Sequence, residues 1–389
     1  MDRIYLDNNA TTLPLPAVRE AVERALLRGG NPSSPHASGR AARALLSEAR
    51  EAVAALLGAA PREVVFTGGG TEADNLAVIG GARAAVAGGA DRRVVTTTVE
   101  HPAVEDACAR LEQEGFEVVR VGVDAEGIPD PEALAAAVTP GTALLAVMLM
   151  QNETGALFPV AEAFALARAR SRCVRLHADA VQALGKIPFS PGALGADTVA
   201  VSAHKIHGPQ GVGALWVREG REPLPRAHGG KQEKGVRTGT ENVPGAAGFG
   251  AAAAAALAEA SARSARAERI GALLEEGVMA LPGARRNGPP RARRHPWTIN
   301  VSFEGVRGDL LLMALDAAGV HVSTGSACAS GAPLPSRPLR AMGLAVERAA
   351  EAVRFSAGAL TTEEEVLRAV EALRPAVERI RASVGIISP

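Results

Sequence analysis

The chain has 389 residues, enough for two domains, and its 42 basic and 42 acidic side chains give a formal net charge of zero, which does not favour a nucleic acid partner. Its three cysteines (Cys108, Cys173 and Cys328) are far apart and odd in number, so the sequence indicates neither a disulfide framework nor a cysteine metal site. The polar N-terminus and the short apolar runs indicate a cytoplasmic protein without a signal peptide, a membrane span or a bound metal.

Short apolar runs alternate with longer segments of helical periodicity up to about residue 240. We predict seven strands, at residues 64–67, 93–97, 118–121, 143–150, 175–179, 198–202 and 213–217. Helical patterns lie between them at residues 36–57, 72–86, 102–114, 131–138 and 160–170. The alternation predicts an α/β fold, and the continuous apolar runs predict a mostly parallel sheet with helices on both faces.

The pattern changes in the last third of the chain. An Ala-rich helical region runs to residue 281 and is followed by a strand at 297–303, a helix at 309–318, a loop of small residues around Cys328, a strand at 352–356 and a helix from residue 363. We therefore predict a large domain at residues 14–255. A smaller α+β domain at residues 256–389 would take in residues 1–13 and carry the cysteine loop.

Five arginines stand among glycines and prolines in one stretch: Arg285, Arg286, Arg291, Arg293 and Arg294. We interpret this stretch as a solvated loop. A docking patch for an acidic protein is the alternative.

A lysine follows one of the apolar strands closely. The strand at 198–202 ends in Ser202, and His204 and Lys205 come next, ahead of a loop rich in glycine and proline. Because ligands of open α/β sheets bind at the carboxyl ends of strands, an amine held there is partly desolvated and available for Schiff-base chemistry. Taken alone, the pattern also fits a lysine that is merely solvated.

A second apolar strand, at 175–179, ends in Asp179, and Gln182 follows three residues later. Pyridoxal phosphate (PLP) needs a carboxylate that keeps its pyridine nitrogen protonated, because the protonated ring is the electron sink. Asp179 suits that role, and Gln182 could hydrogen-bond the ring hydroxyl oxygen. The alternative for Asp179 is a helix N-cap.

A Gly-rich turn joins the strand at 64–67 to the next helix and includes Gly70 and Thr71. Backbone N–H groups at the start of a helix bind anions, and glycines let a phosphate approach closely. The turn matches neither the dinucleotide-binding nor the P-loop pattern. A phosphate cradle, with Ser202 and His204 closing it from the other side, is the natural use, and an ordinary strand–helix turn is the alternative.

Two more strand ends carry polar groups suited to the same cofactor. His101 follows the strand at 93–97 and could stack on the PLP ring and move protons, or else cap a helix. Asn152 follows the strand at 143–150 and offers an amide to the cofactor or to a substrate carboxylate. Since five strand ends each deliver a group suited to PLP, the sequence predicts a PLP enzyme.

Beyond these separate signals, nearly the whole chain resembles the cysteine desulfurases of the class V aminotransferase family, which have PLP fold type I. The matching segments are residues 6–12, 31–36, 71–75, 100–101, 177–182, 202–209, 237–242, 326–328 and 354–356. The loop at residues 323–330 is similar to the NifS/IscS-like branch, group I, of that family.

The resemblance implies a role for each matching residue. Besides Lys205 as the covalent anchor and His101 stacked on the ring, the cofactor-binding residues are Gly70, Thr71, Asn152, Asp179, Gln182, Ser202, His204 and Thr240. Thr240 matches a threonine that reaches the phosphate of the other subunit, which implies an obligate homodimer. The substrate-binding residues are Arg354, Asn152 and Asn31, with the planar fork of Arg354 pairing the substrate carboxylate.

The implied reaction converts L-cysteine into L-alanine. Lys205 and His101 would handle the protons, and the thiolate of Cys328 would attack the substrate sulfur and keep it as a persulfide. A sulfur-acceptor protein such as an iron–sulfur scaffold, or a tRNA thiolation pathway, would take the sulfur onward. Cys108 and Cys173 are expected to fill the core.

Two alternatives stay open. A selenocysteine lyase or an aminotransferase on the same fold would not need Cys328, so full cysteine desulfuration by a Cys328→Ala variant would favour them. A cofactor-free sulfur-relay or assembly scaffold would be colourless, and borohydride would reduce nothing at Lys205.

Overall fold

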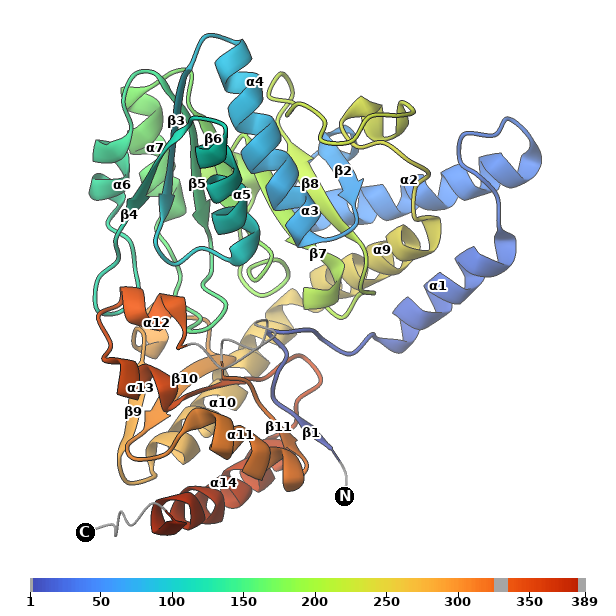
Figure 1. Cartoon of the computed structure of the whole chain (residues 1–389). Helices are drawn as coiled ribbons and strands as arrows, with labels where there is room; N and C mark the ends of the chain where they lie inside the picture. Colours follow the sequence, from blue (N-terminus) through green and yellow to red (C-terminus); the bar gives the residue numbers. More distant parts are fainter. Residues whose placement is uncertain (1–2, 325–334, 384–389) are drawn as a thin grey trace.

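The structure, a computed structural model, describes residues 3–324 and 335–383, and a seven-stranded sheet lies at its centre (Figure 1). In spatial order the strands are β2 (Val64–Thr67), β8 (Gly213–Val217), β7 (Thr198–Ser202), β6 (Arg175–Asp179), β5 (Thr142–Met148), β3 (Asp91–Thr97) and β4 (Glu117–Val121). Strand β8 runs antiparallel to both of its neighbours, and the remaining pairs are parallel. The predicted α/β fold with a mostly parallel sheet is confirmed.

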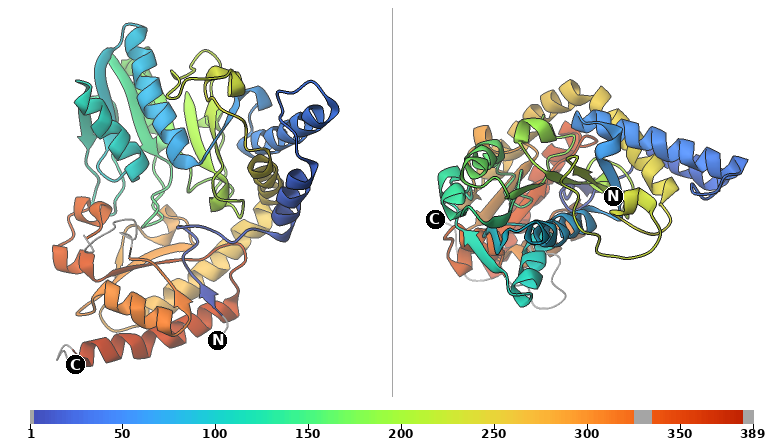
Figure 2. Two further views of the ribbon diagram at one scale, coloured as in Figure 1. Left: turned by 45° about the vertical axis from the view of Figure 1, so that its right-hand side comes forward. Right: turned by 90° about the horizontal axis from the view of Figure 1, so that it is seen from above.

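Helices cover both faces of this sheet, because alternate residues of each strand point to opposite sides (Figure 2). One face, with Val94 and Leu144, packs against α4 (Gly81–Ala87) and α5 (Pro102–Gln113). The other face, with Val95 and Leu145, packs against α2 (Ala37–Leu57), α6 (Pro131–Ala137), α7 (Val160–Arg170), α8 (Pro191–Leu194) and α9 (Val243–Ala258). Burial on both sides holds the strand ends in place.

Two predicted helices are interrupted in the structure. The helix predicted at 72–86 consists of α3 (Gly70–Asn75), a π-helical turn (Leu76–Gly80) and α4. The Ala-rich region forms α9 and α10 (Ala260–Met279), which meet at an angle of 75°. Neither break contains proline, so propensity could not locate it. In the described part of the chain no single helix is long and apolar enough to cross a membrane, and only α9 and α10 taken together reach that length.

A second core lies below the large sheet. It is built on the antiparallel sheet β12 (Ala352–Ser356), β10 (Thr298–Phe303) and β9 (Ala284–Asn287), together with α10, α11 (Gly308–Ala317) and α14 (Glu363–Ser383). The N-terminal strand β1 (Ile4–Tyr5) pairs with β11 (Val320–His321), and Ile4 and Leu6 lie in this core. Helices α12 (Arg337–Ala341) and α13 (Val346–Ala350) complete this part of the chain. The separate core supports the proposed domains at 14–255 and 256–389 with 1–13, whose exact boundaries stay a prediction.

The interpretation of the five arginines as a solvated loop holds for the exposed Arg291 and Arg293 and is wrong for the other three. Arg285 and Arg286 belong to β9, and Arg294 is buried beside Glu275, with nitrogen and carboxylate oxygen 2.8 Å apart. All five arginines lie within 3.7 Å of a carboxylate oxygen of the same chain. Since these carboxylates neutralise the cluster, it lacks the excess positive charge that would favour docking of an acidic protein.

The two cysteines in the described residues differ in burial. Cys108 is fully buried on α5, and burial raises the pKa of its thiol to about 12, as expected for a residue that fills the core. Cys173 is partly exposed just before β6, and its Sγ lies 3.1 Å from the carbonyl oxygen of Pro140. Cys173 therefore packs against the edge of a small core cluster, formed by Ala85, Ala90 and Ala143, and is not fully buried as Cys108 is.

Candidate active site

The carboxyl ends of β5, β6 and β7 and the turn after β2 meet around one cavity of about 310 Å³. That volume is in the range of small-molecule sites. Ten of the residues predicted from the sequence line it: Gly70, Thr71, His101, Asn152, Asp179, Gln182, Ser202, His204, Lys205 and Arg354. The parallel sheet brings them together because its strands end at the same edge.

Three predicted residues are not placed at this cavity. Asn31, in the connection between α1 (Pro16–Arg28) and α2, and Thr240, which precedes α9, are exposed and do not line the cavity of their own chain. Cys328 lies outside the described residues. The roles of all three residues stay predictions.

Asp179 and His101 present a buried acid and a neutral imidazole to the cavity. Burial raises the pKa of Asp179, an effect that the nearby His101 and Lys205 oppose, and its Oδ1 accepts the N–H of Val181 at 2.9 Å. Burial lowers the pKa of His101, whose Nδ1 accepts the N–H of Ala103 at 3.1 Å, at the start of α5. The neutral ring therefore carries its proton on Nε2. His101 is both a helix cap and a cavity residue, whereas Asp179 caps a turn and not a helix.

Lys205 follows β7 in a single turn of 3₁₀ helix, and its ammonium reaches the N-terminal segment. Its Nζ donates to the carbonyl oxygens of Asn9 at 2.6 Å and Ala10 at 2.7 Å. The neighbouring His204 has Nδ1 3.1 Å from Thr11 Oγ1, and burial lowers the pKa of His204 to about 4. The end of β7 thus supplies an amine and a neutral imidazole side by side.

One corner of the cavity fits the phosphate group of PLP. The hydroxyl of Ser202 is buried there and makes no hydrogen bond to any described residue. A Cβ added at Gly70 would lie 2.6 Å from Cγ2 of Val181 and 3.6 Å from Cβ of Ser202, so the absence of a side chain keeps this corner open. A buried hydroxyl without a partner is costly until a ligand satisfies it. Thr71 and His204 add further donors on the same wall.

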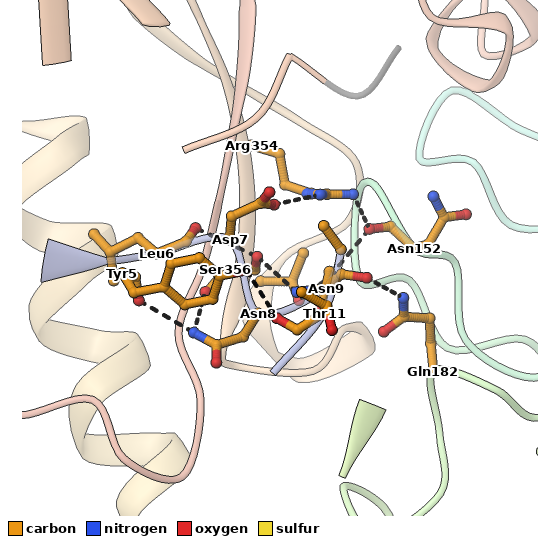
Figure 3. A network of polar contacts seen from close by, with 12 residues as sticks. Tyr5, Leu6, Asp7, Asn8, Asn9, Thr11, Asn152, Gln182, Arg354 and Ser356 are labelled. Atoms are coloured by element: carbon orange, nitrogen blue, oxygen red, sulfur yellow. Dashed lines mark hydrogen bonds and ion pairs between the residues drawn. The ribbon is translucent and has the colours of Figure 1, made fainter. Parts of the chain in front are cut away.

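Arg354 brings a guanidinium from β12 to the same cavity (Figure 3). Its Nη2 donates to Asp7 Oδ1 at 2.6 Å, and its Nη1 donates to the carbonyl oxygen of Asn152 at 3.1 Å. The side chain is only 5% exposed, and its Nε has no hydrogen-bond partner within the described ranges. A buried guanidinium that is oriented and has N–H groups to spare suits a substrate carboxylate.

The N-terminal segment is a part of the site to which the sequence analysis assigned no role (Figure 3). The carbonyl oxygen of Asn9 accepts from Gln182 Nε2 at 2.8 Å as well as from Lys205. The side-chain Nδ2 of Asn9 donates to the carbonyl oxygen of Asn152 at 3.0 Å. The segment follows a strand of two residues, so periodicity could not place it at the cavity. The match of residues 6–12 to the family was the one signal available.

Lys186 and Asp74 were also missed. Burial, together with the positive charges of Lys205 and Arg354, lowers the pKa of Lys186 to about 7. Asp74 lines the cavity and lies 3.2 Å from Nε2 of the buried His177; burial above all raises the pKa of its carboxyl. Neither residue follows a strand directly, so no strand end marks them. Asp74 lies within the matching segment 71–75, whereas Lys186 lies outside all the matching segments.

We expect an Asp7→Ala variant to raise KM for cysteine about tenfold, with a smaller change in kcat, because a charge-assisted hydrogen bond orients the guanidinium of Arg354. Steady-state kinetics on the purified enzyme measure both constants. Asp7→Asn is the matched control, since it keeps an acceptor oxygen, and its KM should stay closer to that of the unchanged enzyme. Equal KM values for the Ala variant and the unchanged enzyme would show that Asp7 does not position Arg354.

A strand-end lysine and a buried carboxylate that share one cavity with a phosphate-binding corner define a PLP-dependent enzyme of the α/β class. The profile of the aminotransferase class-V family matches residues 4–369. Since every residue that lines the cavity lies within this range, the match covers the whole site.

Comparison with known proteins narrows the class. A cysteine desulfurase of Cereibacter sphaeroides is 46% identical over 388 residues, which are 98% of this chain and 97% of that protein. The cysteine desulfurase IscS of Dictyoglomus turgidum is 40% identical, with 97% and 95% of the two chains covered. A solved NifS-like protein is 35% identical with a TM-score of 0.89, covering 99% of this chain and 100% of its own. The chain belongs to the cysteine desulfurases of the aminotransferase class-V family.

Proposed function

We infer that this protein is a PLP-dependent cysteine desulfurase that takes sulfur from L-cysteine and releases L-alanine. The observation that carries this inference is the single cavity that Lys205, Asp179 and Arg354 share. It offers an amine to hold the cofactor, an acid for its ring nitrogen and a cation for an amino acid carboxylate. A solved structure of SspA in complex with cysteine, 29% identical with a TM-score of 0.80 over 92% of this chain, supports cysteine as the substrate.

The residues around the cavity would hold PLP by its several groups. When bound, PLP supplies an electron sink next to the α-carbon of the substrate. As a carboxylate, Asp179 would accept a hydrogen bond from the pyridine nitrogen and keep it protonated, and Ser202, Thr71 and His204 would donate to the phosphate. Lys205 holds the cofactor covalently and, once released, removes and returns the proton on the α-carbon. His101, with its proton on Nε2, covers the ring and donates to the departing or returning groups.

Arg354 would orient the substrate. Its buried guanidinium pairs with the carboxylate, and Asn152, whose carbonyl oxygen already accepts from Arg354, adds its side-chain amide. Fixing the carboxylate at one end of the cavity turns the α-carbon toward Lys205 and limits its motion.

Cys328 is proposed to receive the sulfur. Its thiolate attacks the sulfur of the substrate, the new S–S bond forms, and the C–S bond breaks with its electron pair going to carbon. Protonation of that carbon completes the methyl group of alanine, and the enzyme keeps the sulfur as a persulfide on Cys328. A sulfur-acceptor protein then takes it, and an iron–sulfur scaffold or a tRNA thiolation pathway in the cytoplasm would be the destination.

We propose a homodimer because Thr240, which the resemblance assigns to the phosphate, does not line the cavity of its own chain. A second cavity of about 500 Å³ opens beside the phosphate corner and is lined by Thr71, Ser202 and His204. Thr240 of a second copy could close this opening and donate to the phosphate, which would make the site incomplete in a single chain. Light scattering that gives the mass of one 39.8 kDa chain for the active enzyme would rule the homodimer out.

The selenocysteine lyase and the aminotransferase remain the competing activities, because both would use the same lysine, acid and arginine. Incubating the purified protein with cysteine labelled in sulfur and carbon separates them. We expect one labelled alanine per sulfur removed and the labelled sulfur bound at Cys328, located by mass spectrometry of peptides. A labelled keto acid in place of alanine, or alanine formed from selenocysteine alone, would overturn the proposed function.

A further inference from the structure

A second ammonium lies behind the wall of the cavity. Nζ of Lys186 donates to Oε1 of Gln182 at 2.8 Å and to Oδ1 of Asn9 at 3.2 Å. Gln182 and Asn9 both line the cavity, whereas Lys186 does not. Lys186 therefore acts on the site through these two amides and not by contact with a ligand.

The hydrogen-bond partners of the Asn9 side chain fix which end of its amide is the oxygen and which is the NH₂ group. Its Nδ2 donates to the carbonyl oxygen of Asn152 at 3.0 Å and to Oγ1 of Thr298 at 2.9 Å, so its Oδ1 is left to face Lys186. Turning this amide over would place its NH₂ against an ammonium and its oxygen against a carbonyl oxygen, so the contacts with Lys186 and Asn152 would both be lost. Asn9 thus presents a fixed acceptor to Lys186.

The orientation of the Gln182 side-chain amide is fixed in the same way, and Figure 3 shows its contact with Asn9. Its Oε1 accepts from Lys186, and its Nε2 donates to the carbonyl oxygen of Asn9 at 2.8 Å. The inverted amide would again set donor against donor and acceptor against acceptor. An NH₂ group has two hydrogens, and the second is the one that Gln182 has left for a ligand in the cavity.

We propose that Lys186 is a positioning residue that makes Gln182 a hydrogen-bond donor, and never an acceptor, toward the phenolic oxygen of PLP. The proposal rests on the proposed function and on the expectation from the sequence that Gln182, which lines the cavity, hydrogen-bonds that oxygen. A donor stabilises the oxygen in its deprotonated form and draws charge from the ring, so it lowers the pH at which the bound chromophore titrates. Without Lys186, Oε1 loses its donor, and of the two contacts described above only that of Nε2 with the carbonyl oxygen of Asn9 still opposes inversion of the amide. The inverted amide, which turns Oε1 toward the cofactor oxygen, then costs less.

The burial of Lys186 supports the assignment of its two hydrogen bonds to Gln182 and Asn9. The pKa of Lys186 falls to about 7, first because of burial and then because of the positive Lys205 and Arg354. An amine placed at such a cost to its charged form needs satisfied hydrogen bonds, and the two amide oxygens supply them. The uncharged amine keeps two hydrogens, one for each of these acceptors, so both contacts can persist in either charge state.

The test is the pH titration of the chromophore in a Lys186→Met holoenzyme, because methionine has a similar length and no donors. We expect PLP to remain covalently bound at Lys205, as shown by borohydride reduction and mass spectrometry. The titration midpoint should rise by about one pH unit, since a hydrogen bond to a charged oxygen is worth about that much. We expect kcat to fall about tenfold and KM to change little. Lys231→Met, at an exposed lysine, is the matched control and should behave like the unchanged enzyme.

A double-mutant cycle separates positioning from a through-space charge effect. In a Gln182→Met background, Lys186→Met should cause no further shift of the midpoint. A full shift in that background, or no shift in the single variant, would overturn the proposal.

If Lys186→Met does not fold, the Gln182→Glu variant tests the same point, because a carboxylate beside Lys186 has no hydrogen to donate. An unchanged titration midpoint in this variant would also overturn the proposal. Failure of the proposed function can be told apart from failure of this proposal, because in that case the unchanged protein would hold no PLP at Lys205.

Discussion

Replacing Lys205 with alanine is expected to lower cysteine desulfuration at least about 10⁴-fold, because the variant loses both the covalent anchor and the base for the α-proton. Lys205 lies at the end of β7 in the same cavity as Asp179 and Arg354. The other described lysine near the cavity, Lys186, is held by Gln182 and Asn9 on the far side of the wall and cannot take over. Alanine formation and the mass of the borohydride-reduced protein together measure the loss.

A control variant and a chemical rescue experiment test whether the loss of activity is specific to Lys205. Lys231→Ala changes an exposed lysine and should keep full activity and the reducible chromophore. Added methylamine should restore part of the activity of Lys205→Ala, since a small amine fits the space left by the side chain and can accept the α-proton. Desulfuration by Lys205→Ala at more than a tenth of the normal rate would mean that another group performs the proton transfer.

The part of the site that lies at strand ends could be predicted from the sequence. Asp179, Lys205 and Asn152 each follow an apolar run, and parallel strands necessarily end at one edge of the sheet. Recognising the strands in the sequence was therefore enough to predict that these three residues lie close together. Arg354 is different, because it comes from the smaller sheet, and only the resemblance to a family tied it to the cavity.

The rest of the site depends on contacts between residues far apart in the chain. Asn9 meets Lys186 across 177 positions, and Asp7 meets Arg354 across 347. Local patterns carry no information on such pairs, since each depends on how the N-terminal segment crosses between the two cores. The arginine cluster shows the same limit: the neighbouring glycines and prolines favour a loop, yet Glu275 lies in α10 and neutralises the buried Arg294.

The second large effect is expected at Cys328, whose replacement by serine should lower alanine formation at least about 10³-fold and leave the PLP chromophore unchanged. The flanking residues support this expectation. Ser323 lines the cavity and pairs with Arg354 through two backbone hydrogen bonds, Ser323 N–H to Arg354 O at 3.1 Å and Arg354 N–H to Ser323 O at 2.6 Å. Beyond the cysteine, Ser336 Oγ donates to the buried Glu153 at 2.6 Å.

Chain length makes the thiol available to the cavity. Cys328 follows Ser323 by five positions, and five residues of extended chain span at most about 17 Å, so the chain is long enough for Cys328 to reach a substrate paired with Arg354. Serine is close in size but too weak a nucleophile toward sulfur, so binding is kept while the C–S bond stays intact. Labelled sulfur should therefore be missing from the peptide that contains residue 328.

Cys173→Ser is the matched control for this variant. Cys173 is the partly exposed cysteine, and it precedes β6, whereas the cavity lies at the opposite, carboxyl end of that strand. Both the alanine rate and the sulfur bound at Cys328 should be unchanged in Cys173→Ser. If Cys328→Ser still forms alanine at the normal rate, the sulfur leaves by a route that needs no protein thiol, and a lyase-type reaction would explain the site better than sulfur transfer to Cys328.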